Sequence, residues 1–293
     1  MFRNARTQRI SRLLIHSIST SLFFFCLSSV SAQNQTQSVQ VKNFTRIVGP
    51  EDGDLAVPGP ALTSVQRDPS ALQVITAFLT AANSGGWGGM QATGTLTSPG
   101  KTEEQYPATL TVKNGDSFRL DVSATEGQRS LRIQGQVGAI LESNGVKHTL
   151  PPATALGGFL AFPRLMMATF PGEQTSVLDQ GIVVVEGKSL HRITIQEQVF
   201  HGATPPTTDQ PSIVDLYFDP ATHLLVKSVA LVQLDTADRA RYMQAITYSE
   251  YQSVNSVLLP FAYSQTLNGQ RQWSLQLANV QLDSSTDTSL FIF

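Results

Sequence analysis

The stretch that decides the fold runs from residue 212 to residue 234 and reads SIVDLYFDPATHLLVKSVALVQL, and the same pattern continues to residue 282. Runs of β-branched, aromatic and aliphatic residues alternate there with turn signals. Asp219-Pro220 presets a turn through the fixed φ of proline, and Asn268-Gly269 is typical of a two-residue hairpin. The C-terminal quarter therefore predicts consecutive antiparallel strands at 214–218, 223–234, 245–251, 257–263 and 273–282.

The same period-two pattern extends upstream. Phe118, Leu120 and Val122 share one face of a strand, with Arg119 and Asp121 on the other. Further strands are expected at 91–97, 108–113, 117–123, 130–136, 176–186 and 189–200, with turns at 114–115, 144–145 and 186–188. In the last strand the apolar residues change parity after position 277, which predicts a β-bulge near 278–279. The count is about eleven strands.

One helix precedes the strands. Asp68 is a good N-cap, and Pro69 suits the first helical position because its missing N–H costs nothing there. Asn83 and the residues after it end the helix. One apolar stripe follows helical spacing: Ala71, Leu72, Ile75, Phe78, Leu79 and Ala82. This stripe must lie on the sheet.

The segment TALGGFLAFPRLMMATF, residues 154–170, is mostly apolar and carries one charge, Arg164. Gly157, Gly158 and Pro163 disfavour a continuous helix, so one or two short helices are expected. The segment is interpreted either as a crossover helix buried on the sheet or as a movable apolar lid over a cavity. On the second interpretation, the candidate ligand-binding residues are Phe159, Leu160, Phe162, Leu165, Met166, Met167 and Phe170, with Trp273 on the sheet.

The first 32 residues have the composition of an export signal. Four arginines form a basic start, an apolar run follows at 22–27, and Val30-Ser31-Ala32 is a small-residue cleavage site. The alternative is a membrane anchor, but the run is about half of the ~20 residues that a span needs. We expect residues 1–32 to be a cleaved signal peptide, 33–67 a flexible Pro- and Gly-rich arm, and 68–293 one folded domain in the periplasm or secreted.

Charge and motif content restrict the function. The chain after residue 32 has 16 basic and 22 acidic residues and no cysteine, which argues against nucleic acid as a partner and leaves the core to hold the fold. The histidines His148, His191, His201 and His223 lack metal-ligand spacing, and no nucleophile-elbow motif occurs. We therefore expect a protein that has no cofactor or metal and does not catalyse a reaction. We also expect it to be a monomer.

Strand 223–234 is apolar on both parities: Leu224, Val226, Ala230 and Val232 alternate with Leu225, Val229 and Leu231. A sheet that is apolar on two sides needs cover on both, or it curls to enclose a cavity. This pattern is the physical basis for expecting an apolar ligand.

The order of elements resembles the LolA-like periplasmic lipoprotein-carrier superfamily. The phrases that carry the resemblance are Leu216–Pro220, Ile246–Tyr251, Val257–Phe261, Leu267–Gln270 and Leu290-Phe291. The resemblance implies an α+β fold: an unclosed β-barrel around an apolar cavity, with an N-terminal amphipathic helix and a helical lid insertion. It further implies that an arginine ties the lid shut. Arg119, Arg132 and Arg164 are possible counterparts, and none lies in a matching motif.

Three functions remain open. The first is a non-catalytic carrier or sensor of lipid, acyl chains or lipoprotein in the bacterial envelope. The second is a regulatory module that binds an envelope polypeptide in a groove or at a sheet edge. The third is a hydrolase with a dispersed site.

Overall fold

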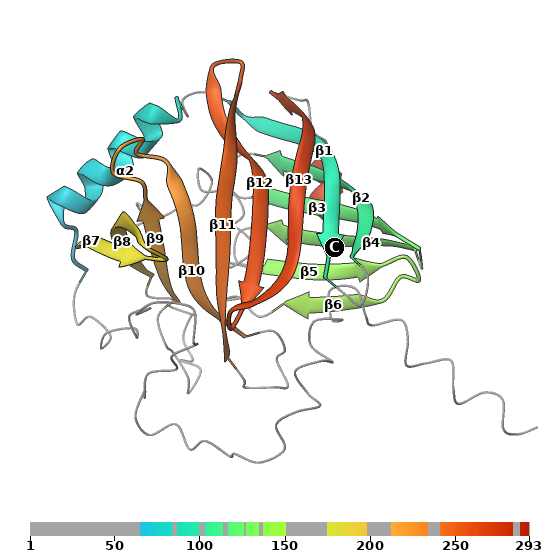
Figure 1. The fold of residues 1–293 in the computed structure, drawn as a ribbon. Coiled ribbons are helices and arrows are strands. Elements are labelled where there is room, and N and C mark those ends of the chain that lie inside the picture. Colours follow the sequence, from blue (N-terminus) through green and yellow to red (C-terminus); the bar gives the residue numbers. More distant parts are fainter. Residues whose placement is uncertain are drawn as a thin grey trace, which may run out of the picture.

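The computed structural model describes residues 65–83, 87–99, 103–113, 117–125, 127–134, 137–150, 175–197, 212–233, 241–283 and 288–292. These residues form one open antiparallel sheet of thirteen strands (Figure 1). The first six strands are β1 (Gly89–Ser98), β2 (Glu104–Lys113), β3 (Ser117–Ala124), β4 (Gly127–Gln134), β5 (Val137–Glu142) and β6 (Lys147–Leu150). The others are β7 (Thr175–Val185), β8 (Lys188–Glu197), β9 (Ser212–Phe218), β10 (Leu225–Gln233), β11 (Arg241–Val254), β12 (Val257–Leu267) and β13 (Gln270–Leu282).

The spatial order is β6-β5-β4-β3-β2-β1-β13-β12-β11-β10-β9-β8-β7. Strands that follow one another in the sequence are paired, except that β6 and β7 form the two edges of the sheet and do not pair with each other. The long-range pair of β1 with β13 joins the two meanders, β1–β6 and β7–β13, into one sheet. The sheet curves strongly, so that β11–β13 run steeply in Figure 1 while β4–β6 lie nearly horizontal to their right, behind β13. The face enclosed by this curve is called the inner face below, and the opposite face the outer face.

Two features of the expected fold need correction. The described part of the chain is mostly β rather than α+β, because its one α-helix has 13 residues. The strand count is thirteen rather than about eleven, because β5 and β6, with six and four residues, are too short to show clear alternation. The lid insertion expected at 154–170 lies outside the described residues.

The hairpin turns follow the local chemistry. Both central residues have positive φ at Glu186-Gly187, with 50° and 76°, and at Asn268-Gly269, with 48° and 78°. These values are those of the type I′ turns that match the twist of antiparallel strands. Both turns were predicted, and so was the turn at 144–145 between β5 and β6.

The bulge predicted near 278–279 is confirmed. Thr93 of β1 pairs with Asn279, and the next residue, Gly94, pairs with Leu277, so Ala278 is the extra residue. A Cβ at Gly94 would lie 2.2 Å from the carbonyl oxygen of Gln276, so the close approach of the two backbones requires glycine there. The extra residue returns the apolar side chains of β13 to the inner face.

Helix α2 (Pro69–Ala81) begins and ends near its predicted signals, with Asn83 at a left-handed φ of 46°. Ala71, Phe78 and Ala82 are buried, whereas Leu72 is 42% exposed, so its assignment to the buried stripe was wrong. Leu72 directly follows Ala71, and one step rotates a side chain by about 100°, which places it outside the face set by positions 71, 78 and 82.

Both ends of α2 are bound to the sheet. Asp68 N donates to Val177 O at 2.9 Å, and Val177 N donates to Gln66 O at 2.8 Å. At the other end, Leu258 N donates to Ala82 O at 2.9 Å. The helix therefore reaches from the edge strand β7 to the β11–β12 hairpin.

Candidate functional site on the inner face

The inner face carries one continuous apolar cluster drawn from both meanders. Its buried members come from strands far apart in the sequence: Met90, Leu110, Phe118, Leu120 and Ile133 on one half, and Leu216, Phe218, Ile246, Tyr263 and Leu275 on the other. The outer face of β7–β11 has a smaller cluster of Val185, Leu190, Tyr217, Val229 and Ala245. The apolar residues on both faces of β10, expected from the sequence, are confirmed.

Polar side chains within the inner face are paired with one another. Ser228 Oγ and Tyr248 Oη are 2.7 Å apart, and Gln265 Nε2 donates to Gln244 Oε1 at 2.8 Å. The ring of Tyr263 meets that of Tyr248 edge-on, with centroids 6.0 Å apart. Burial raises the pKa of Tyr248 and of Tyr263 above the ordinary value, so both phenols stay neutral. This part of the wall is uncharged.

Helix α2 covers one end of the inner face. The ring of Phe78 lies 5.7 Å from the ring of Phe218 of β9, tilted by 57°. Val74, Ile75 and Leu79 pack against the same cluster and are partly buried.

A polar cluster fastens the start of α2 to β7 and β8. Asp179 Oδ1 lies 2.7 Å from His191 Nε2, and the carboxylate of Asp68 accepts a hydrogen bond from Asp179 N at 2.9 Å instead of capping the helix. Burial works against the charged form of Asp179, but hydrogen bonds from Gly181 N, His191 and Ser70 outweigh it and lower the pKa of this carboxyl group.

A second charged cluster lies on β4, β5 and β6. Arg129 Nη2 is 4.0 Å from Glu142 Oε1, and His148 Nε2 is 3.4 Å from the same oxygen. The strand register places all three side chains on the inner face, because Arg129 lies opposite both Val122 and Glu142, and His148 lies opposite Ile140. No motif in the sequence indicates this cluster.

Comparison with solved structures identifies the fold. A candidate outer membrane lipoprotein-sorting protein domain from Vibrio parahaemolyticus superposes with a TM-score of 0.50 at 11% sequence identity, covering 75% of this chain and 95% of that one. A LolA superfamily protein from Nitrosomonas europaea gives a TM-score of 0.48 at 11% identity, over 76% and 97% of the two chains. A DUF1329 family protein from Desulfovibrio piger gives 0.49 at 9% identity, over 77% and 98%. No protein-family model matches the sequence, and no curated protein does.

The chain is structurally similar to LolA-superfamily proteins. The resemblance stated from the sequence is thereby confirmed at the level of the fold. At these identities the likeness concerns the fold alone.

Of the predicted ligand-binding residues, only Trp273 lies in the described part. It is half-buried and packs against the inner apolar cluster from β13. The others, Phe159, Leu160, Phe162, Leu165, Met166, Met167 and Phe170, lie outside the described residues.

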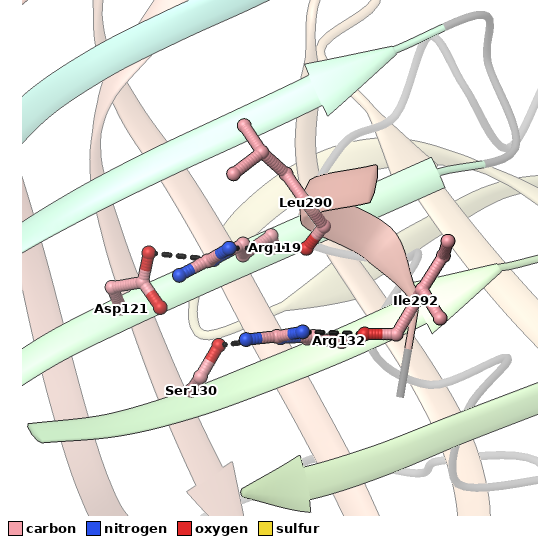
Figure 2. A network of polar contacts seen from close by, with 6 residues as sticks. All are labelled: Arg119, Asp121, Ser130, Arg132, Leu290 and Ile292. Carbon is pink, nitrogen blue, oxygen red and sulfur yellow. Dashed lines mark hydrogen bonds and ion pairs between the residues drawn. The ribbon is translucent and has the colours of Figure 1, made fainter. Parts of the chain in front are cut away.

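Two of the arginines considered as lid latches face away from the inner wall. Arg119 and Arg132 lie opposite one another on the outer face of β3 and β4, where they hold the C-terminal 3₁₀ helix η1 (Thr288–Phe291), as Figure 2 shows. Arg119 donates to Leu290 O at 3.1 Å, and Arg132 donates to Ile292 O. Arg164, the third candidate, lies outside the described residues.

The side chains that orient these two arginines lie on the same strands. Asp121 accepts a hydrogen bond from Arg119 Nε at 2.7 Å, and Ser130 accepts one from Arg132 Nε at 3.2 Å (Figure 2). Partial burial is the main cause that lowers the pKa of Arg132, and the nearby positive charge of Arg119 is the second. Both arginines therefore serve the attachment of the C-terminal segment to the sheet.

Within the described ranges, no group of three His, Cys, Asp or Glu side chains could hold a metal ion. No helix of this part of the chain is long and apolar enough to cross a bilayer. His191 binds Asp179, and His201, considered as its cross-strand neighbour, lies outside the described residues.

Two further features lie on the surface at α2 and β7. An open groove of about 710 Å³ runs along the outward side of α2, lined by Pro69, Leu72, Gln73, Thr76, Ala77, Thr80, Ala81 and His223. Beyond the segment that pairs with Gln66–Asp68, the edge strand β7 carries Ile182 and Val184, which are 56% and 68% exposed.

Proposed function

We propose that this protein is an exported envelope protein that binds an apolar ligand, such as a lipid, an acyl chain or the acyl chains of a lipoprotein, on the inner face of its curved sheet. It acts as a carrier or sensor and does not catalyse a reaction. The observation that carries the proposal is the inner wall itself. Buried apolar side chains from both meanders form one cluster there, and their polar neighbours pair internally as neutral groups.

The fold and the sequence support this proposal independently. The Vibrio parahaemolyticus domain with the same fold bears the description of an outer membrane lipoprotein-sorting protein domain. Residues 1–32 have the composition of a signal peptide with cleavage near Ala32, which would deliver the folded domain to the periplasm or the exterior. The proposal includes residues 154–170 as an apolar lid and Trp273 as a contact of the ligand.

The experiment uses the full chain purified without detergent. Native mass spectrometry should detect a co-purified lipid, and a fluorescent fatty acid should bind and be displaced by unlabelled fatty acid. The chain has two tryptophans, Trp87 and Trp273. In the variant Trp87→Phe, a fatty acid brominated along its chain should quench the remaining fluorescence of Trp273, because a bromine atom quenches only an indole that it touches. Absence of both bound lipid and quenching would refute the proposal.

A second function, binding of a polypeptide at the sheet edge, is favoured by β7. The first half of this strand already accepts the chain at Gln66–Asp68, and the second half presents the two exposed β-branched side chains. An exposed apolar edge is a template for strand addition. Val184→Lys should abolish capture of an envelope polypeptide, while Ser189→Lys, at the position opposite on β8, should not. Equal capture by both variants would exclude this edge.

A further inference from the structure

The edge of the sheet at β7 is divided by a bulge. The pairing of β7 with β8 shifts in register around Gly181, which has a φ of 74°. On the N-terminal side of the bulge, the chain at Gln66–Asp68 pairs with the outward edge at Val177. On the C-terminal side, no strand of the described residues lies beyond 182–185, because β7 ends the strand order. This second half of the edge is therefore open.

The register of the β7–β8 hairpin shows which backbone groups the open edge presents. Val185 directly precedes the two-residue turn at 186–187 and pairs with the first residue of β8. Residues that flank such a turn exchange both hydrogen bonds, and the bonding direction alternates along the strand. Val183 and Val185 therefore direct their N–H and C=O groups toward β8, whereas Ile182 and Val184 direct theirs to the open edge. The edge presents two donors and two acceptors.

The composition of this edge favours pairing with another strand. Residues 182–185 read IVVV, with neither a charge nor a proline. Proteins usually protect an exposed edge with charges, proline or a covering segment. Here the side chains of Ile182 and Val184 are exposed on one face, and a Cβ at Gly181 or at Gly187 would meet no atom within 4 Å. The edge is β-branched, uncharged and accessible.

A second copy of the same edge satisfies all of these backbone groups in one register. In an antiparallel pair centred on Val183, Ile182 of each copy lies opposite Val184 of the other. Each of these two opposed pairs exchanges two hydrogen bonds, so every outward N–H and C=O is used. A pair centred on Ile182 or Val184 would instead leave one outward residue of each copy opposite the bulge or the turn. The twofold axis also places the exposed side chains of Ile182 and Val184 side by side on one face.

The neighbouring charges do not oppose this register. Glu186 is the first charged residue after the apolar run, and its carboxylate binds Lys227 Nζ at 3.1 Å. The two copies of Glu186 would lie at opposite ends of the paired segment, about 20 Å apart at roughly 3.4 Å per residue. This separation exceeds the Debye length of about 8 Å in physiological salt, so their repulsion is screened.

We propose that this protein forms a twofold-symmetric dimer in which residues 182–184 of two copies pair antiparallel about Val183 and join the two sheets edge to edge. Because the interface consists of one short strand pair, the dimer is weak and dissociates on dilution. The monomer expected from the sequence is then the dilute state. The dimer occupies the same edge as the envelope polypeptide of the second function, and it does not depend on binding of an apolar ligand.

The first test is sedimentation velocity of the full chain from about 1 µM to about 200 µM, the range in which a weak interface assembles. Val184→Lys is the test variant, because a lysine on an edge strand opposes edge pairing. Ser189→Lys is the matched control, because it adds the same charge at the position opposite on β8. The wild type and Ser189→Lys should shift from monomer to dimer, whereas Val184→Lys should raise the dissociation constant at least about tenfold. Far-UV circular dichroism checks that each variant folds.

Disulfide crosslinking tests the register. Cys26, the one native cysteine, is replaced by serine in every variant. Val183 would face its own copy as a non-hydrogen-bonded pair with Cα atoms about 4.5 Å apart, a separation that a disulfide spans. Val183→Cys should therefore give a covalent dimer with copper phenanthroline as oxidant. Ser189→Cys is exposed, but three strand spacings, about 14 Å, would separate it from its copy, so it should not crosslink.

Each other outcome would overturn the proposal. A monomer at every concentration would reject the dimer, and crosslinking of Val183→Cys no faster than that of Ser189→Cys would reject the register. A dimer that Val184→Lys leaves intact would place the interface on another surface. A monomer that captures an envelope polypeptide through β7 would assign the edge to the second function. None of these results alters the lipid assays, so failure of the dimer and failure of the proposed function are distinguishable.

Discussion

Replacement of Phe78 by alanine tests whether α2 is part of the core that forms the inner wall. Phe78 is 3% exposed, and its ring packs on that of Phe218. Truncation of a buried phenylalanine costs about 3–5 kcal/mol, of which the aromatic pair accounts for about 0.5–1.5 kcal/mol. For a domain of this size the loss corresponds to a melting temperature lower by roughly 6–20 °C.

The assay is urea unfolding followed by far-UV circular dichroism, with thermal melting as a second readout. Leu72→Ala is the matched control, because Leu72 lies one residue from the buried face and is partly exposed. It should change the free energy of unfolding by about 0.5 kcal/mol or less. A loss below about 1 kcal/mol for Phe78→Ala would refute the reasoning and make α2 a loosely attached cover.

Three further predictions follow from single contacts. Gly94→Ala should destabilise the protein by about 1–3 kcal/mol, since its Cβ would meet backbone oxygen, whereas Gly88→Ala, with open space around it, should be nearly neutral in the same unfolding assay. Because the pKa of Asp179 is lowered in the folded protein, its carboxylate stabilises the native state at pH values above the ordinary aspartate pKa of about 4. This stabilisation is lost as the pH falls through the lower pKa of the folded state. The difference in unfolding free energy between wild type and Asp179→Asn should therefore be largest near neutral pH and shrink below about pH 4; a constant difference would contradict this. Arg132→Gln should speed amide hydrogen exchange at residues 289–292 without a similar change in β4, and unchanged exchange would show that the arginine does not hold η1.

The elements predicted well are those whose signals are local. The start of α2 at Asp68-Pro69 and the turns at Glu186-Gly187 and Asn268-Gly269 depend on the backbone preferences of two or three residues. The bulge at Ala278 was also readable, because the change of parity of apolar residues in one strand requires it. Such features can be predicted without knowing which strands pair with one another in the sheet.

The elements that were missed depend on register. The strand expected at 130–136 begins in the structure at Gly127, so Arg129 belongs to the ladder rather than to a loop. Glu142 and His148 lie on the two short strands that were not counted. Only the pairing of β3 through β6 brings these three side chains to one face, and that pairing is not encoded in any local motif.

The role of the other two arginines was hidden, although the face of Arg119 could be predicted. Arg119 and Arg132 were weighed as lid latches, yet the alternation that buries Phe118 and Leu120 directs Arg119 to the outer face. Their contacts with the C-terminal segment join residues 171 and 160 positions apart in the sequence. No periodic pattern could indicate it.

The central claim is that an apolar ligand lies on the inner face, and a methyl NMR titration measures this most directly. The isoleucine Cδ1 groups report both surfaces, because Ile133, Ile193, Ile195 and Ile246 are buried in the inner cluster, whereas the exposed Ile292 lies beside Arg132 on the outer face. On titration of the isotopically labelled protein with a C16 fatty acid, the inner signals should shift or broaden in a saturable manner while that of Ile292 stays in place. A shift confined to Ile292, or no saturable shift at all, would contradict the account.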